Sequence, residues 1–274
     1  MNIDSGGVFF YIIFVMYSQK INANLFIIMK DCCMKKIILP FFFIICIQSA
    51  FAQFFGQIPQ ATKYSAAKVI DPVYGIKMYE KLNFSIGGDS VRNDKKGYAC
   101  QGWVQDIYEN GGIVHKGYYE DGHLTNYKNF YENGTVERSF KPIDYKRGNM
   151  QIFFPDGKLK SDVTYYEGVP QLWTDYYNNG QIEYKEESSK KMEYLILRKS
   201  FSEDGKPQEI FELVDPKKRL YSKKEYYENG NIKSEGFLNY STSALDYQKN
   251  GTWKEYDEAG KMTEENWVNG ERLK

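Results

Sequence analysis

Short blocks of apolar and polar residues recur along most of the chain, and each block is centred on a glycine that follows Asn, Asp or, once, Ala. The seven glycines are Gly111, Gly134, Gly157, Gly180, Gly205, Gly230 and Gly260. Asn-Gly or Asp-Gly between two apolar runs is the strongest short-range signal of a β-hairpin, because glycine accepts a positive φ at little cost. The pattern therefore predicts a series of hairpins built from short strands.

Two apolar columns flank these turns. Four residues before each glycine stand Ile107, Phe130, Phe153, Tyr176, Phe201, Tyr226 and Tyr256, and two residues after it stand Ile113, Val136, Leu159, Ile182, Pro207, Ile232 and Met262. The column three before the glycine is less regular, because Ser202 and Asp257 interrupt it. A three-residue loop that ends in a left-handed glycine pairs the two regular columns, whereas a two-residue loop does not. We therefore expect the three-residue loop, with Tyr176 facing Ile182 across the strands.

Successive turn glycines lie 23, 23, 23, 25, 25 and 30 residues apart. A near-constant period in this range indicates a stacked repeat protein, in which each unit buries its surface against its neighbours. A second turn should join each hairpin to the next, and Gly122, Gly168 and Gly270 lie where it is expected. The predicted fold class is all-β, a repetitive antiparallel β-hairpin meander with seven repeats over residues 101–274.

The fifth repeat departs from the pattern, with Ser202 in place of an aromatic residue and Pro207 in place of an aliphatic one. Because proline cannot donate to a strand ladder, we expect residues 206–224 to bulge, to lie at an edge or to hold a longer loop. The sequence VDPKKRL from Val214 supplies a turn there.

Residues 53–100 precede the first repeat, and we expect them to form a short helical or irregular cap, because the end units of a repeat array need a cover. In DPVYGIKMYEKLNF, Asp71 is a candidate N-cap and Pro72 stands at the first helical position. Apolar residues follow at Ile76, Tyr79 and Leu82, which predicts a short helix that ends before Gly87 and Gly88.

Residues 34–52 have the layout of a secretory signal peptide: two lysines, an apolar run from Ile37 to Ile47, and a small-residue site ending at Ala52. The apolar run is shorter than the ~20 residues that a membrane-spanning helix needs. Residues 1–33 precede this Met-Lys-Lys start, and we interpret them as a gene-model extension. We therefore expect export to the periplasm, the outer envelope or the medium, without a spanning helix in the mature chain.

Charge and cysteine content agree with this view. Residues 1–52 hold four Lys and two Asp, so the remainder carries 32 basic against 34 acidic residues. This balance argues against nucleic acid as a partner, because phosphate binding needs an excess of Lys and Arg. After removal of the leader only Cys100 remains, and we expect it to be a buried thiol.

No motif for chemistry is found. His115 and His123 are the only histidines, and because they lack zinc-ligand spacing we interpret them as surface residues on neighbouring strands. The glycines of GGDSVRND, from Gly87, are expected in a turn rather than in a nucleophile or phosphate-binding loop. We therefore assign no catalytic, cofactor-binding or metal-binding residue, and we do not expect an enzyme.

The repeat unit resembles the bacterial MORN-variant repeat family, whose units have a Trp, an aromatic pair, Asn-Gly and an aliphatic residue. The matching residues are Trp173, Tyr176, Tyr177, Asn179, Gly180 and Ile182, then Trp253, Tyr256, Gly260 and Met262, and also Trp103, Tyr108, Asn110, Gly111 and Ile113. The resemblance extends from Gly102 to Gly270. It implies a curved single-layer antiparallel sheet and a role in binding proteins or organising membranes, and some members are labelled antitoxins.

The aromatic columns are the candidate binding surface, because Tyr and Trp combine apolar area with a polar group. We expect the column three before the glycine to lie on the face opposite the paired columns. The candidate residues are Trp103, Tyr108, Tyr131, Phe154, Trp173, Tyr177, Tyr227 and Trp253.

Three functions are compatible with these features. The first is an exported, non-enzymatic scaffold that binds a protein at the cell envelope, and it rests on the repeats and the leader. The second is a carbohydrate or cell-wall binding module, which would require exposed coplanar rings in a groove. The third is an antitoxin-like protein that neutralises a toxin by binding, although an exported protein is poorly placed to meet a cytoplasmic toxin.

Overall fold

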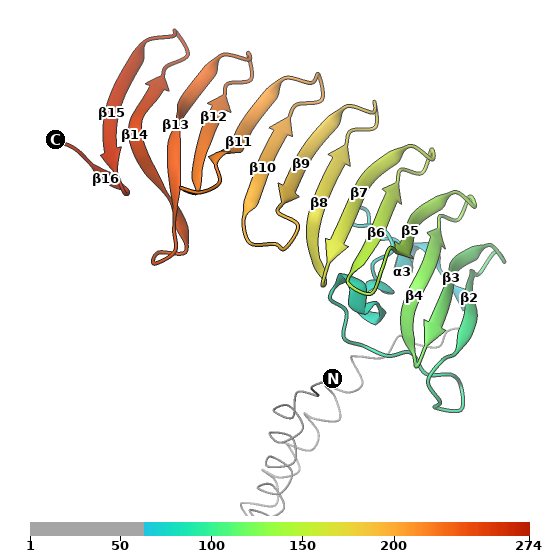
Figure 1. Cartoon of the computed structure of the whole chain (residues 1–274). Coiled ribbons are helices and arrows are strands. Elements are labelled where there is room, and N and C mark those ends of the chain that lie inside the picture. The colour runs from blue at the N-terminus through green and yellow to red at the C-terminus, as the bar shows by residue number, and fades with distance from the viewer. Residues whose placement is uncertain (1–62) are drawn as a thin grey trace, which may run out of the picture. The chain divides into compact units, whose positions relative to one another are not determined.

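The computed structural model describes residues 63–274, and the predicted extension over residues 1–33 and signal peptide over residues 34–52 lie outside them. The described chain forms one open, 16-stranded sheet in which every strand pairs with its neighbours in sequence (Figure 1). The first pair is parallel and all the others are antiparallel. The prediction of an all-β antiparallel meander is confirmed.

The seven predicted hairpins follow one another along the sheet. Their strands are β2 (Gly102–Tyr108), β3 (Ile113–Glu120), β4 (His123–Phe130), β5 (Val136–Pro142), β6 (Arg147–Phe153), β7 (Leu159–Tyr166), β8 (Val169–Tyr176), β9 (Ile182–Ser188), β10 (Leu195–Phe201), β11 (Pro207–Asp215), β12 (Leu220–Tyr226), β13 (Ile232–Ser241), β14 (Asp246–Tyr256) and β15 (Met262–Val268). Two-residue strands flank them, β1 (Lys63–Tyr64) and β16 (Glu271–Arg272).

The predicted register is present at all seven tight turns. Tyr176 pairs with Ile182, and the two apolar columns pair in the same way in every other hairpin. At this turn Gly180 has φ 88°, its N–H donates to the Tyr177 carbonyl, and the Asn179 side chain accepts from the Gln181 N–H. The left-handed glycine and the Asn side chain together fix which residues face each other.

A β-bulge lies next to six of these turns, and outside the fifth repeat it was not predicted. In the second hairpin Asn129 pairs with Arg138 while Phe130 pairs with Val136, so Glu137 is an extra residue. A bulge of this kind turns two consecutive side chains toward the same face. The last hairpin has no bulge, because Tyr256 pairs with Met262 and the next residues continue without a shift.

The looser turns alternate with the tight ones along the opposite edge of the sheet. Turns are present at Gly122, Gly168 and Gly270, where they were predicted, and each is a two-residue turn with positive φ at both positions. In the fifth repeat the predicted turn after Asp215 is present. The expected bulge is present, at Gln208 and again at Val214. The alternatives of an edge or a longer loop are wrong, since β11 lies inside the sheet and Pro207 occupies its first position, where a missing N–H is tolerated.

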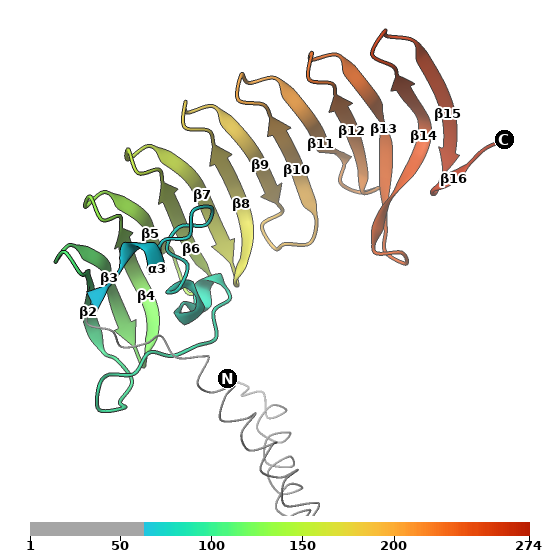
Figure 2. The ribbon, with the colours of Figure 1, turned by 180° about the vertical axis from the view of Figure 1, so that it is seen from behind.

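The two faces of the sheet differ. Asp106, His115, Asn129 and Arg138 pair in turn across β2 to β5, so their side chains share one face, which contacts the segment before the repeats. We call this the cap face and the opposite one the open face. Figure 2 shows the N-terminal segment lying across the first strands, on the side away from the viewer of Figure 1.

The cap, residues 63–100, is mostly irregular. It contains a four-residue helix, α3 (Ala66–Val69), and two short 3-10 helices, η1 (Glu80–Leu82) and η2 (Phe84–Ile86). The helix predicted from Asp71 is wrong. Asp71 accepts from the N–H groups of Val73 and Tyr74, as a cap would, but the chain turns back at Gly75 because the backbone of Ile76 is bound by the sheet.

Apolar side chains are buried in two clusters. The larger lies between the cap and the sheet and includes Ile76, Leu82, Tyr127 and Phe140. The second contains Phe211, Tyr221, Leu238 and Trp253. As predicted, Cys100 is a buried free thiol, in the first cluster.

Glycines make room for large rings on the cap face. A Cβ on Gly236 would lie 2.4 Å from the Trp253 ring, and one on Gly148 would lie 2.2 Å from the Phe140 ring. Because real Cβ atoms do not approach so closely, each ring packs directly on the backbone of the neighbouring strand. This packing supplies buried area that a single-layer sheet would otherwise lack.

Tyrosine hydroxyls join successive hairpins. The column three residues before the glycine donates to a backbone carbonyl at the start of the next tight turn, over 2.7 to 2.8 Å. The bonds are Tyr108 to Phe130, Tyr131 to Phe153, Tyr177 to Phe201 and Tyr227 to Tyr256. Phe154 and Ser202, at the same column, cannot make this bond.

We expect Tyr131→Phe and Tyr177→Phe each to lower the free energy of unfolding by about 1 kcal/mol, because each leaves a part-buried carbonyl without its partner. Urea unfolding followed by tryptophan fluorescence measures this. Tyr226→Phe is the matched control, since no hydrogen bond of its hydroxyl is found in the described chain. Equal losses in all three variants would contradict the proposed link between hairpins.

Candidate binding surface

A buried polar cluster joins the cap to the first strands. Arg92 of the cap forms a bidentate ion pair with Asp106 of β2, at 2.7 and 2.9 Å, and the Tyr79 hydroxyl donates to the same carboxylate at 2.7 Å. The Tyr79 ring stacks on the His115 ring with centroids 3.7 Å apart. Both charges are therefore paired, and the carboxylate accepts three bonds.

His115 is fully buried, so the prediction of a surface histidine is wrong. Its Nδ1 lies 2.7 Å from Oδ1 of Asn129, whose amide nitrogen donates to the Ile76 carbonyl, and its Nε2 lies 2.9 Å from the Tyr119 hydroxyl. This arrangement suits a neutral ring that donates from Nδ1. Burial lowers the pKa of His115 to about 4.

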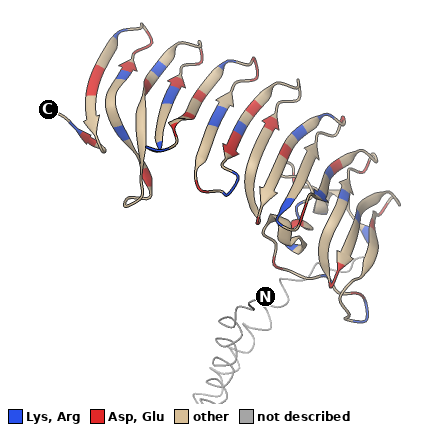
Figure 3. Ribbon diagram, viewed as in Figure 1, with Lys and Arg blue, Asp and Glu red and all other residues tan. Residues whose placement is uncertain are grey.

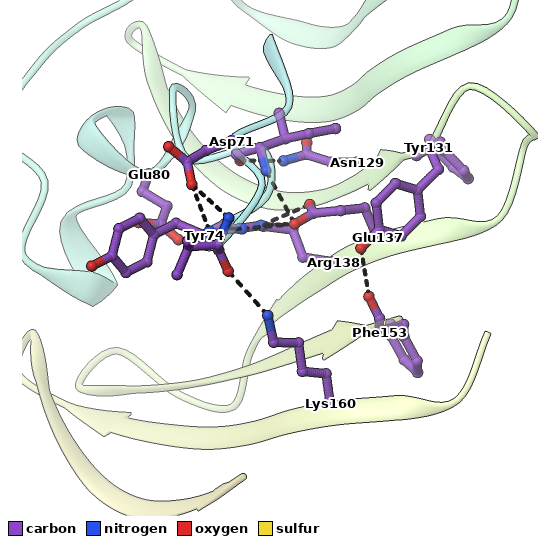
Figure 4. Close-up of polar contacts among 12 residues, drawn as sticks. Asp71, Tyr74, Glu80, Asn129, Tyr131, Glu137, Arg138, Phe153 and Lys160 are labelled. Atoms are coloured by element: carbon purple, nitrogen blue, oxygen red, sulfur yellow. Dashed lines mark hydrogen bonds and ion pairs between the residues drawn. The ribbon is translucent and has the colours of Figure 1, made fainter. Parts of the chain in front are cut away.

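Figure 4 shows a second ionic cluster, around Arg138 and Glu137. Arg138 and Glu137 come from the bulge of β5, and their side chains are paired at 2.7 Å and almost fully buried. Arg138 also contacts Glu80 and donates to the Tyr74 carbonyl, while Glu137 accepts from the Ile76 N–H. These bonds fasten the cap to the sheet.

The predicted surface residues fall into three groups. Trp103 is 59% exposed on the open face, and Trp173 is half-buried on the cap face, with its indole N–H donating to Asp175. Tyr131, Phe154, Tyr177 and Tyr227 are half-buried. Tyr108 and Trp253 are buried, so the expectation that they are accessible is wrong: Tyr108 packs against the cap, and Trp253 covers Gly236.

The ring geometry does not match a platform for sugar binding. Trp103 meets Tyr118 edge to face, with an interplanar angle of 71°, and Trp173 meets Tyr184 in the same way. Coplanar exposed rings, which the carbohydrate hypothesis would require, are not formed by either pair.

The open face carries most of the exposed apolar side chains of the strands. In β2 to β15 every exposed large hydrophobic residue except Val214, which sits in a bulge, lies on this face according to the strand register. They are Trp103, Ile113, Tyr118, Val169, Leu172, Ile182, Phe237, Met262 and Val268. No described segment covers this face. Sequence reasoning found Trp103 but missed the others, which alternation within each strand could have assigned to one face.

The cap face is hollowed beyond the cap. A pocket of about 390 Å³ there has Phe211, Tyr247 and Trp253 among its lining residues, together with charged groups. The charges are balanced by ion pairs, since Lys223 contacts both Glu209 and Glu225. Lys249 lies 4.5 Å from the centre of the Trp253 ring.

Charged residues of both signs are distributed along the whole sheet (Figure 3). In residues 63–274 there is no group of His, Cys, Asp or Glu side chains that could hold a metal ion. The same part of the chain has no helix long and apolar enough to cross a membrane.

Comparison with known families shows what these hairpins are. The family model of the MORN repeat variant matches residues 146–165, 172–190, 223–240 and 249–269. The chain carries MORN-variant repeats. No curated protein matches the sequence.

Each matched MORN-variant segment coincides with one tight-turn hairpin of the sheet, around Gly157, Gly180, Gly230 and Gly260. The hairpins around Gly111, Gly134 and Gly205 are not matched, yet they pair the same two columns. The repeat geometry therefore extends to all seven hairpins.

We expect the stability of the folded protein to fall between pH 7 and pH 5. The unfolded chain binds a proton at His115 below about pH 6.5, whereas the folded chain does not until about pH 4, so stability is lost as pH falls through this window. The loss is at most about 1.4 kcal/mol per pH unit. Urea unfolding at pH 7 and pH 5 measures it.

His115→Gln should be less stable than wild type at pH 7 but should lose less on acidification. His123→Gln serves as the control. It leaves His115 in place, together with the two charged groups near it, Asp106 and Arg92, so it should keep the wild-type response. If His115→Gln responds to pH as wild type does, the buried neutral histidine is not the cause.

Proposed function

We propose that this protein is a non-enzymatic repeat scaffold that binds a partner protein across its open face. MORN repeats are generally found in repeat proteins that bind proteins or membranes. The observation that carries the proposal is the placement of the exposed large hydrophobic side chains of the strands on one uncovered face. Exposed apolar side chains that share one face of a folded domain support an interaction site there.

The architecture supports a scaffold role. A stacked repeat sheet holds its surface on a rigid frame, because each hairpin is bonded to the next and the cap is fastened by buried ion pairs. A partner can therefore meet many strands at once, with little ordering of the scaffold on binding.

We further propose that the scaffold acts outside the cytoplasm, at the cell envelope or beyond it. The support is the leader layout of residues 34–52 in the sequence.

Partner binding can be tested with a photo-crosslinking amino acid placed in the full-length protein in its own cells. Leu172 and Phe237 are open-face positions on distant strands, and Glu255 is an exposed position on the cap face. We expect the same protein adduct from Leu172 and Phe237 and none from Glu255. Adducts from Glu255 alone, or none from either open-face position, would contradict the proposal.

Export can be tested by fractionation of cells that express the full-length gene, with the N-terminus of the product determined by mass spectrometry. We expect a product that starts at Gln53 outside the cytoplasm. A cytoplasmic product that starts at Met1 would contradict export and would favour the antitoxin-like alternative.

A further inference from the structure

Three lysines gather on the open face of the first strands. Lys116 of β3 and Lys128 of β4 pair directly across the strands, and Lys141 lies on the same face of β5. All three are exposed, and none forms an ion pair within residues 63–274. Like charges directly opposite each other on neighbouring strands are destabilising, so the fold does not gain from this arrangement.

In the far half of the same face three lysines are paired with carboxylates, although Lys185, which lies opposite Lys199, forms no ion pair within residues 63–274. Lys199 pairs with Glu212 at 2.5 Å, Lys224 with Glu235 at 3.1 Å and Lys254 with Glu264 at 3.9 Å. The strand register places Lys199, Lys224 and Lys254 in the same cross-strand row of side chains as Lys116 and Lys128. The repeat can therefore place a carboxylate beside an open-face lysine, and the first strands lack one.

In the middle of the strands the open-face neighbours of the three lysines are uncharged, and Glu120 lies on the same face at the end of β3. Over β2 to β6 the remaining open-face positions in the middle of the strands are amides and a hydroxyl, among them Gln105, Asn126 and Ser139. Asp162 on β7 is the nearest carboxylate in this row, and it accepts from the side-chain amides of Asn149 and Gln151. Positive charge here is thus left unbalanced.

A hollow is lined by Lys128 and Lys141. It has a volume of about 350 Å³, and Lys128, Ser139, Lys141, Gln151 and Phe153 are among its lining residues. On its flank Lys116 lies 5.4 Å from the centre of the exposed Trp103 ring. The patch therefore offers ammonium groups, amide groups and apolar rings side by side.

We propose that the open face of β2 to β6 binds an acidic segment of the partner protein, whose carboxylates pair with Lys116, Lys128 and Lys141 and whose apolar side chains meet Trp103 and Phe153. This inference rests on the proposed function, because it names the part of the open face that selects the partner. Pairing across the interface would remove the repulsion between Lys116 and Lys128.

The charge distribution favours a peptide over a broad anionic surface. The turns that border the patch carry Glu109, Glu132 and Asp156, and the whole chain has no net charge. A membrane or a nucleic acid would bring phosphates against these acids as well as against the lysines, whereas a single segment can lie along the lysines alone.

The test measures binding of a fluorescent peptide of alternating Glu and Tyr to the full mature chain, with a Gln and Tyr peptide as the uncharged probe. The variant is Lys116→Gln/Lys128→Gln/Lys141→Gln. The matched control is Lys199→Gln/Lys224→Gln/Lys254→Gln, which removes three lysines from the same face of the far half. Anisotropy is read at 50 and 300 mM NaCl, with circular dichroism and urea unfolding to verify folding.

We expect wild type to bind the acidic peptide and not the uncharged one, with at least a fivefold loss of affinity at the higher salt concentration. The first triple variant should lose at least tenfold while its unfolding midpoint stays equal or rises, since like charges are removed. The control triple should lose less than twofold. Equal losses in the two triples, or no binding by wild type, would overturn the inference.

Vesicles containing phosphatidylserine and a single-stranded oligonucleotide are tested in the same assay, and tighter binding of either than of the acidic peptide would also overturn it. The crosslinks from Leu172 and Phe237 distinguish a failure of this inference from a failure of the proposed function. If Leu172 and Phe237 still trap one partner while the acidic peptide does not bind, the scaffold proposal stands and the acidic-segment inference fails.

Discussion

A sheet one layer thick has few neighbours with which to bury its side chains, and this constraint explains most of the structure. Each hairpin must gain its contacts from the hairpins on either side, which places large rings in repeated columns. The tyrosine hydroxyls that reach the next hairpin and the rings that lie on Gly148 and Gly236 are two ways of meeting this need. The register set by the left-handed turn glycines keeps these columns aligned along the sheet.

The cap meets the same constraint at one end by adding a second layer on one face only. It is fastened by buried ionic and hydrogen-bonded groups, and pairs of this kind fix a geometry more than they add stability, since burial of the charges offsets much of their attraction. Arg92 with Asp106 and Arg138 with Glu137 are the two anchors. The consequence for function is that no part of residues 63–274 covers the opposite face.

Local patterns in the sequence determine the hairpins, and for that reason the pairing of Tyr176 with Ile182 and the turns at Gly122 and Gly168 could be predicted. Features that depend on distant residues could not. Ile76 does not continue a helix, because its backbone is bound by Glu137 and Asn129, and His115 is buried because Tyr79 stacks on it. The bulges of the first three hairpins carry no sequence signal, since the extra residue varies among Val114, Glu137 and Lys160. The hydrogen bonds of the tyrosine hydroxyls could not be predicted either, because their partners are backbone carbonyls.

A partner that occupies the open face in the cell should protect that face from chemical labelling, and cysteine accessibility detects such protection. Leu172→Cys and, on the cap face, Glu255→Cys are labelled with a maleimide in intact cells and in the purified protein, and the labelled peptides are quantified by mass spectrometry. The buried Cys100 provides an internal low-reactivity reference. The account predicts that Leu172→Cys is protected in cells and reactive when purified, while Glu255→Cys reacts in both. Equal reactivity of Leu172→Cys in cells and in purified form would contradict it.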